Sequence, residues 1–123
     1  MILNIKRREK ILKDHPNLYK QYIYFDCGNG WLDIIEQLSN DIEKLIVKDL
    51  STFTDEFFIP QCIEVKEKFG QLRFYMTIET AEMHELIENA IEKSQNTCEK
   101  CGERGRFTNI GWYKTRCKKH ELE

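Results

Sequence analysis

Cys98-Glu-Lys-Cys101-Gly102, followed after a polar and aromatic loop by Cys117-Lys-Lys-His120, is the stretch that decides the fold of this chain. Two close pairs of soft ligands with such a loop between them are typical of a zinc site built from three thiolates and one imidazole. Two residues between paired ligands let one turn direct both side chains to one ion, and Gly102 permits the positive φ that such a turn usually needs. We therefore predict Cys98, Cys101, Cys117 and His120 as zinc ligands.

We interpret this zinc as structural, because four protein ligands fill a tetrahedral shell and leave no position for water or substrate. Disulfides are one alternative, but residues 1–8 hold no apolar segment long enough for a secretory signal. A redox motif is another, but residues 98–101 lack the preceding strand and following helix that such motifs use. The remaining cysteines, Cys27 and Cys62, fit free thiols in a reducing cytoplasm. We therefore favour Zn²⁺ as the cofactor and expect a cytoplasmic protein.

Charge is segregated along the chain although the formal net charge is only −2. Residues 98–120 carry seven Lys and Arg against two Glu, whereas residues 21–97 carry six Lys and Arg against fifteen Asp and Glu. Part of the positive charge balances three thiolates around one Zn²⁺, and the rest is suited to phosphate. The acidic body could face a basic protein partner. Because no run approaches the roughly 18 apolar residues of a membrane span, we expect no membrane partner.

Two amphipathic helices and a hairpin are predicted in the body. Apolar residues recur at helical spacing from Trp31 to about Lys48, and again in a helix that begins at Thr80 as N-cap. Between them, residues 61–78 alternate apolar and charged side chains about a turn at Gly70-Gln71. The expected apolar positions are Trp31, Ile34, Ile35, Leu38, Ile42, Leu45 and Ile46; Ile63, Val65, Phe69, Leu72, Phe74, Met76 and Ile78; and Met83, Leu86, Ile87, Ala90 and Ile91.

Shorter segments complete the prediction. A helix over residues 4–14 is expected to end at His15, because the proline that follows pushes this residue out of the α region. We place His15 on the surface. Residues 18–25 fit either a strand or a connecting segment, and the sequence does not decide between them. Asn29 or Gly30 is expected to cap the helix that follows.

The connection over residues 50–60, Phe57 included, is expected to be irregular. Residues 106–116 predict a second small hairpin around Gly111 that delivers Cys117 to the metal. Only three residues follow His120, so we expect the module to be ribbon-like or a shortened treble clef.

These elements predict an α+β fold. Two amphipathic helices pack on an antiparallel β-hairpin, and a zinc-ribbon or treble-clef-like module follows at the C-terminus. We divide the chain into a body of residues 1–96 and a zinc-binding module of residues 97–123, which together form one compact unit.

Three segments then occur in a recognisable order. They are Cys27-Gly-Asn-Gly-Trp31; Val65-Lys-Glu-Lys-Phe-Gly-Gln-Leu-Arg-Phe-Tyr75; and Thr97-Cys-Glu-Lys-Cys-Gly102 with Gly111-Trp112, Thr115, Cys117 and His120. The set covers about residues 26 to 120 and resembles a group of small uncharacterised proteins of phages, prophages and bacterial genomes. The resemblance implies a phage or mobile-element setting in a bacterial host cytoplasm, without naming an activity. Because small phage accessory proteins often bind and block host proteins, it also implies a protein partner, such as a host defence factor that is inhibited.

Candidate binding residues lie in the zinc module, where aromatic and basic side chains are interleaved. Aromatic residues and Arg are the types that form binding hot spots, and cations contact phosphate. The candidates are Trp112, Tyr113, Arg104, Arg106, Lys114 and Arg116. The alternative is that Trp31, Phe74 and one of Trp112 and Tyr113 simply belong to the core.

Our first hypothesis is a non-enzymatic zinc-binding module that acts through protein–protein interaction. The alternative is a nucleic-acid-binding zinc protein that uses the basic module. An enzyme is not expected, because the sequence supplies neither a nucleophile–base–orienter set nor a phosphate loop. Cys27 with His84 is an arbitrary pairing, and Glu64 and Glu67 point to opposite faces of a regular strand. We also expect no small-molecule substrate.

Overall fold

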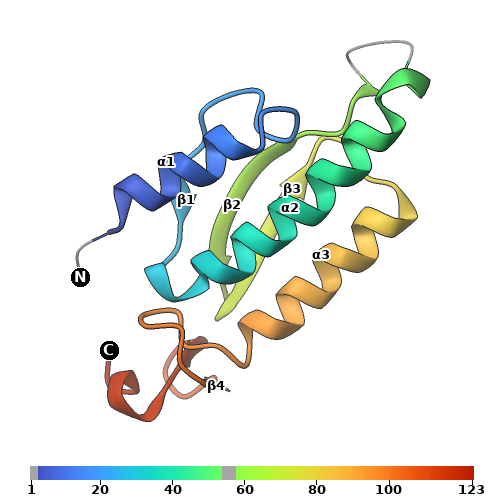
Figure 1. Ribbon diagram of the computed structural model, residues 1–123. Helices are drawn as coiled ribbons and strands as arrows, with labels where there is room; N and C mark the ends of the chain where they lie inside the picture. The colour runs from blue at the N-terminus through green and yellow to red at the C-terminus, as the bar shows by residue number, and fades with distance from the viewer. Residues whose placement is uncertain (1–2, 54–57) are drawn as a thin grey trace.

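The computed structural model describes residues 3–53 and 58–123, and in this part of the chain three helices lie on one face of a three-stranded sheet (Figure 1). A small two-stranded ribbon lies beyond one end of the helices. The elements in chain order are α1 (Ile5–Asp14), β1 (Phe25–Asp26), α2 (Leu32–Asp49), β2 (Cys62–Lys68), β3 (Gln71–Met76), α3 (Ala81–Ser94), β4 (Arg106–Thr108) and β5 (Lys114–Arg116). The predicted α+β class is confirmed.

Helices α2 and α3 turn their predicted apolar stripes towards the sheet, as helical periodicity requires. Buried positions are Ile35, Leu38, Ile42 and Ile46 on α2, and Met83, Ile87 and Ala90 on α3. The hydroxyl of Thr80 accepts the backbone N–H of Met83 at 3.2 Å, so the predicted N-cap is confirmed. Ile34, Leu45 and Leu86 are only half-buried and pack at the edge of the core.

The β2–β3 hairpin forms, but its turn lies one residue earlier than predicted. Lys68 pairs with Gln71, which leaves Phe69-Gly70 as the two-residue turn. Both turn residues have positive φ, 54° and 80°, as a type I′ turn demands. Consequently Phe69, which we expected on the apolar face, is 57 % exposed.

A register shift between Cys62 and Glu64 changes which side chains at the start of β2 face the core. An extra residue in a strand reverses the alternation that follows it. Cys62 is buried and Ile63 is exposed, so the expectation for Ile63 is wrong. Beyond the shift, Val65 and Phe74 pair across the strands and both are buried as predicted.

The sheet contains a third strand, at the end of the segment for which the sequence left strand and connecting segment open. β1 pairs in parallel with β2, through Phe25 opposite Val65. Only two residues take part, which is too short for an alternation pattern to register. Residues 18–25 are therefore mainly a connecting segment, in which Leu18, Tyr19 and Phe25 are buried.

α1 ends at the predicted place, but His15 is buried rather than exposed. Its Nδ1 lies 2.6 Å from the carbonyl oxygen of Ile11, and its Nε2 contacts the side-chain amide of Asn40. Each ring nitrogen therefore has a polar neighbour, and a ring N–H that donates to one of these oxygens lowers the cost of burying the ring.

The expected cap of α2 is also wrong. The helix follows a 3₁₀ turn over Asn29–Trp31, and Trp31 holds the N-cap position without a side-chain hydrogen bond. The Asn29 side chain instead accepts the N–H of Asn4 at 2.9 Å and a guanidinium N–H of Arg8 at 3.1 Å. Buried Arg8 also donates to the carbonyl oxygens of Phe25 and Cys27, so α1 holds this turn in place.

Phe57, placed in the irregular connection over residues 50–60, lies outside the described residues. Within the described part of the chain, no helix combines the length and apolar character needed to cross a membrane.

Candidate metal centre

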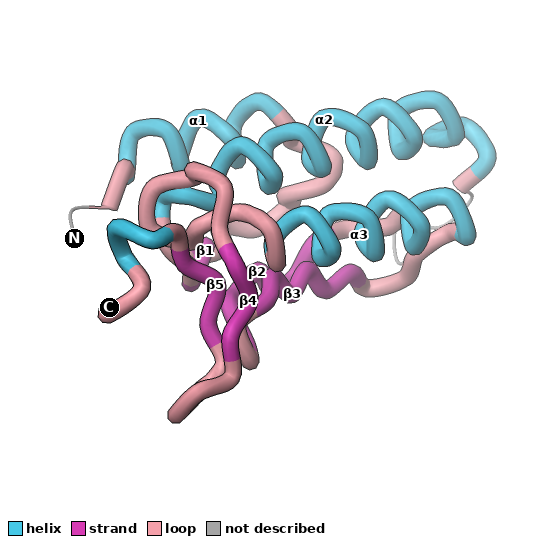
Figure 2. The backbone as a smooth tube through the Cα atoms, turned by 90° about the horizontal axis from the view of Figure 1, so that it is seen from below, coloured by secondary structure: helices cyan, strands magenta, loops and turns pink. Residues whose placement is uncertain are grey.

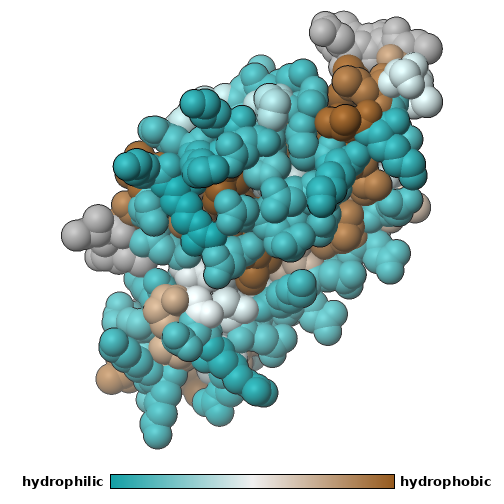
Figure 3. Space-filling view, viewed as in Figure 1, coloured by the Kyte–Doolittle hydropathy of each residue, from teal (hydrophilic) through white to brown (hydrophobic). Residues whose placement is uncertain are grey.

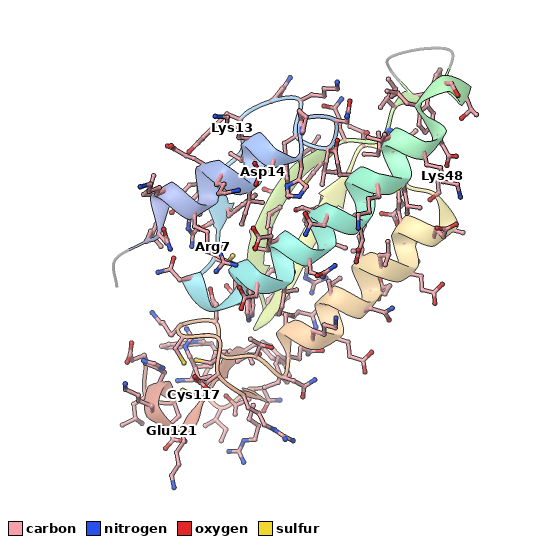
Figure 4. The ribbon with its side chains drawn as sticks, viewed as in Figure 1. Arg7, Lys13, Asp14, Lys48, Cys117 and Glu121 are labelled. Carbon is pink, nitrogen blue, oxygen red and sulfur yellow. The ribbon has the colours of Figure 1, made fainter. Side chains whose placement is uncertain are left out.

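Four side chains from the two ends of the module converge on one point. The ligand atoms of Cys98, Cys101, Cys117 and His120 all lie within 4.8 Å of one another. The sulfurs of Cys101 and Cys117 are 3.7 Å apart, and Nδ1 of His120 lies 3.7 Å from the sulfur of Cys98 and 3.2 Å from that of Cys117. Figure 4 shows Cys117 beside the sulfur atoms of this module. The predicted ligands therefore meet.

These separations fit one tetrahedral ion. Zn–S bonds of about 2.3 Å and Zn–N bonds of about 2.0 Å imply S···S edges of about 3.8 Å and S···N edges of about 3.5 Å. A disulfide needs an S–S bond of about 2.05 Å, and all five cysteines of the chain are free. Three thiolates and one imidazole form a donor set that suits zinc. The site can therefore hold a metal such as zinc.

The electrostatics of the cluster also favour a cation. Burial acts to raise the pKa of Cys98, but backbone N–H groups of Cys117, Cys101 and Lys100 outweigh it and lower this pKa to about 7. The backbone N–H of Glu103 acts to lower the pKa of Cys101, yet burial and the neighbouring sulfurs raise it on balance. Converging thiolates therefore resist joint ionisation until a cation compensates their charge.

Each ligand pair lies on its own hydrogen-bonded turn. Gly102, with φ of 83°, donates its N–H to the carbonyl oxygen of Cys98 at 2.9 Å, which closes the first turn. A 3₁₀ turn over Lys118–His120 presents the second pair, and the N–H of His120 donates to the carbonyl oxygen of Cys117 at 3.1 Å. The two-residue spacing of each pair is therefore what places both ligands on one side.

The first turn, residues 98–102, packs against the glycine-rich turn of residues 28–30 in the body. Gly30 donates its N–H to the carbonyl oxygen of Glu99 at 2.8 Å, and Gly28 donates to the Glu99 carboxylate at 2.9 Å. A Cβ on Gly30 would lie 2.0 Å from the carbonyl oxygen of Cys98, closer than any side chain can tolerate. The other carboxylate oxygen of Glu99 accepts from Arg116 at 3.0 Å, and both side chains are largely buried. Glu99 thus joins both ends of the module to the body.

A second contact holds the β4–β5 ribbon against the β2–β3 turn. The buried hydroxyl of Thr115 donates to the carbonyl oxygen of Gly70 at 2.6 Å. Phe107 and Phe69 both pack on the ring of Tyr113, with centroids 5.8 and 5.7 Å away. Figure 2 shows the ribbon beside the ends of β1 and β2.

The structure separates the two tryptophans. Trp31 is fully buried and donates its indole N–H to the carbonyl oxygen of Thr97 at 2.8 Å. Trp112 is 67 % exposed and Tyr113 is 45 % exposed. Trp31 and Phe74 are both buried, so the alternative that they belong to the core is correct. Neither Trp112 nor Tyr113 is buried, so the same alternative is wrong for these two residues.

The candidate cations lie around an open groove of about 720 Å³, which we call the module groove. Strand register places Arg106 opposite Arg116, and Thr108 opposite Lys114, on one face of the ribbon. Arg116 is committed to Glu99, and Lys114 donates to the carbonyl oxygen of Glu121. The groove is lined by Arg104, Arg106, Lys114, Arg116 and Lys118, by Gly105, Thr108, Cys117 and Glu121, and by the exposed side chains of Ile110 and Leu122.

Other candidates do not assemble into a site. Burial raises the pKa of both the Cys27 and the Cys62 thiol to about 12, so both are poor nucleophiles at neutral pH. His84 is exposed and paired with Glu79 at the start of α3. Among the described residues, the one grouping of three or more His, Cys, Asp and Glu side chains arranged to hold a metal is the Cys₃His set.

The sequence interpretation missed the residues that seat the module. From the sequence, Gly30 is considered only as a candidate helix cap, and no contact is assigned to Gly28 or Glu99. The available signal was a pair of glycines next to a tryptophan, because a turn with two glycines admits the close approach of another backbone. Comparison with protein-family models, with curated proteins and with solved structures returns no match for this chain.

Proposed function

We propose that this chain is a non-enzymatic binding protein whose structural zinc holds a docking surface in shape. Its partner is a protein that presents an acidic and apolar segment to the module groove. The observation that carries the proposal is the exposure of Trp112 in the turn between the two ligand pairs, beside cations. Tryptophan and arginine dominate binding hot spots, and a solvent-exposed indole contributes little to folding.

The chemistry of the module groove favours an acidic protein segment. Arg104, Arg106 and Lys118 offer charge to carboxylates, and Ile110 and Leu122, 86 % and 96 % exposed, offer apolar contact. Aliphatic side chains add nothing to phosphate recognition, whereas they match the apolar anchors of a protein interface. The Lys114 ammonium lies 5.9 Å from the ring centre of Trp112, which joins the charged and aromatic parts of this surface.

The resemblance to small phage and prophage proteins supports a host protein as the partner, with inhibition of a defence factor as one such role. A filled tetrahedral shell gives the zinc no open coordination position, which supports a binding role over a catalytic one. In this proposal the chain acts in a bacterial cytoplasm by occupying its partner.

The test is affinity capture from nuclease-treated bacterial lysate with the wild type, Trp112→Ala and Arg106→Glu. Tyr22→Ala and Lys20→Glu are matched controls, because both residues are exposed on the body. We expect one protein to co-elute with the wild type and with the controls, and to fall about tenfold with either module variant. Equal recovery with all variants contradicts the proposed surface.

Nucleic acid is the second candidate, favoured by the basic face of the β4–β5 ribbon. Arg106 lies opposite Arg116 across the strands, and while Arg116 pairs with Glu99, Arg104, Arg106 and Lys118 line the groove and offer charge to phosphate. Anisotropy with labelled single-stranded and duplex DNA and RNA over a salt series decides the matter. Phosphate binding predicts an affinity that falls steeply with salt, and no binding at low salt removes this candidate.

A further inference from the structure

The seam between α2 and α3 forms a second groove, on a different part of the molecule from the module groove. Ile34 of α2 lies near Lys93 of α3, and Leu45 lies near Glu82, so the two helices run antiparallel along it. The lining residues span eleven steps on each helix, which at 1.5 Å per residue is about 17 Å. We call this the helix groove. Its length accommodates about three turns of a partner helix.

The floor of the helix groove is apolar. Ile34, Leu45 and Leu86 are half-buried, and Leu38 and Ala90 lie deeper between them. Figure 3 shows apolar surface along this seam, bordered by hydrophilic side chains of both helices. Side chains from a docked helix at i, i+3 or i+4, and i+7 would meet such a floor in succession.

Acidic side chains along the edge of the helix groove favour a basic partner. Asp41 on α2 and Glu82 and Glu85 on α3 line the same part of the groove, which has a volume of about 450 Å³. Glu82 and Glu85 have no ion pair or hydrogen bond through their side chains within residues 3–53 and 58–123. Lys44 also lines this part, and Lys93 lines the narrower end, so three carboxylates face two ammonium groups. The acids are concentrated where the groove is wide.

We propose that the helix groove docks a basic amphipathic helix of a protein partner, with leucine-like anchors on Leu45 and Leu86 and Lys or Arg heads on Glu82 and Glu85. This site is independent of the proposed function of the module groove. Together the two grooves take partners of opposite charge at separate surfaces, which makes the chain an adaptor. Complementary charge speeds and orients such an encounter, and apolar anchors supply its affinity.

The test uses the zinc-loaded chain of residues 1–123 and an amphipathic Leu/Lys peptide of about 14 residues, long enough for about three helical turns. A Leu/Glu peptide of the same pattern is the charge control. Titration calorimetry compares the wild type with the double variant E82K/E85K. The matched variant E79K/E88K makes the same change of net charge outside the groove, at Glu79 just before α3 and at Glu88 on α3. Zinc content and circular dichroism verify that each variant is folded.

The proposal expects binding of the Leu/Lys peptide, a loss of about tenfold in E82K/E85K, and little change in E79K/E88K. Backbone amide shifts on titration should cluster on α2 and α3. No binding at about millimolar peptide, equal loss in both double variants, or tight binding of the Leu/Glu peptide overturns it. Concentration-dependent self-association that E82K/E85K abolishes also overturns it, in favour of a second copy as the occupant. Module variants such as Trp112→Ala should leave peptide binding unchanged, so this proposal and the proposed function can fail separately.

Discussion

The C-terminal module, residues 97–123, has two faces, and they differ in how much of their structure is explained by contacts within the chain. On the inner face, which we define by Glu99, Thr115 and the backbone of Cys98, Glu99 accepts from Gly28 and Gly30 of the body, and Thr115 donates to Gly70. Glu99 also accepts from Arg116 within the module. On the outer face, defined by Trp112 and the module groove, aromatic and aliphatic side chains are exposed. The inner face is built for stability, whereas the outer face presents residue types that proteins use for binding.

Substitutions on the two faces should therefore have different effects, even where the residues are close in sequence. A change on the inner face should alter metal content or the free energy of unfolding. A change on the outer face should alter neither, and should act on partner binding alone. Four substitutions, ordered by expected effect on stability, test whether the division is real.

Removing a metal ligand should have the largest effect. Cys117→Ser should abolish stoichiometric zinc and lower the free energy of unfolding by several kcal/mol, because metal binding energy is folding energy in small metal modules. Metal analysis and urea denaturation measure the two quantities. Cys62→Ser is the control, since this cysteine is buried outside the cluster and its variant should retain one zinc per chain.

Gly30→Ala tests the close approach of the module to the body. Its Cβ would lie 2.0 Å from the carbonyl oxygen of Cys98 and 2.6 Å from the amide nitrogen of Gly102, so the backbones must separate. We expect a loss of about 3 kcal/mol in urea denaturation. Gly111→Ala has no atom within 4 Å of its Cβ, and its φ of 85° costs only about 1 kcal/mol. Equal losses of unfolding free energy in the two variants would show that the close contact of Gly30 with the Cys98 turn does not stabilise the fold.

Glu99→Gln tests the charged link across the inner face. The amide keeps the shape of the carboxylate but loses the ion pair with Arg116, so we expect a loss of about 1 to 2 kcal/mol with zinc retained. Glu103→Gln is a suitable control because that side chain is exposed. If both variants unfold at the wild-type urea concentration, Glu99 does not couple the module to the body.

Trp112→Ala should have the smallest effect on stability. With 67 % of the residue exposed, its removal should change the free energy of unfolding by no more than about 0.5 kcal/mol and leave zinc content unchanged. Thermal unfolding of the zinc-loaded protein is the measurement. A large loss of stability would show that the outer face also serves the fold, and would remove the main support for the proposed docking surface.

Three segments that are far apart in the sequence, residues 27–31, 65–75 and 97–120, are joined by backbone contacts at the C-terminal module. Gly30 of the first contacts the Cys98 turn of the third, and Gly70 of the second accepts from Thr115 of the third. They are separated in sequence by up to 71 residues, as for Gly28 and Glu99. We infer that the glycines of these segments are required where the backbone of the module approaches too closely for a side chain.

The Cys₃His cluster, helices α2 and α3 and the existence of the β2–β3 hairpin could be predicted because each depends on spacing within one segment. Ligand pairs two residues apart, a helical stripe and a period of two are local patterns, and local patterns are visible in the sequence. The turn position of the hairpin was wrong by one residue, since Phe69 adopts a positive φ that its residue type does not signal.

Tertiary structure alone decided which residues of the same type became core or surface. Trp31 is buried and Trp112 is exposed, His15 is enclosed by Ile11 and Asn40, and β1 exists only because β2 is there to pair with it. The physical reason is that burial, parallel pairing and the close approach of Gly30 to the metal module are set by contacts between distant segments. A chain carries the residues for such contacts, but their partners become known only once the chain has folded.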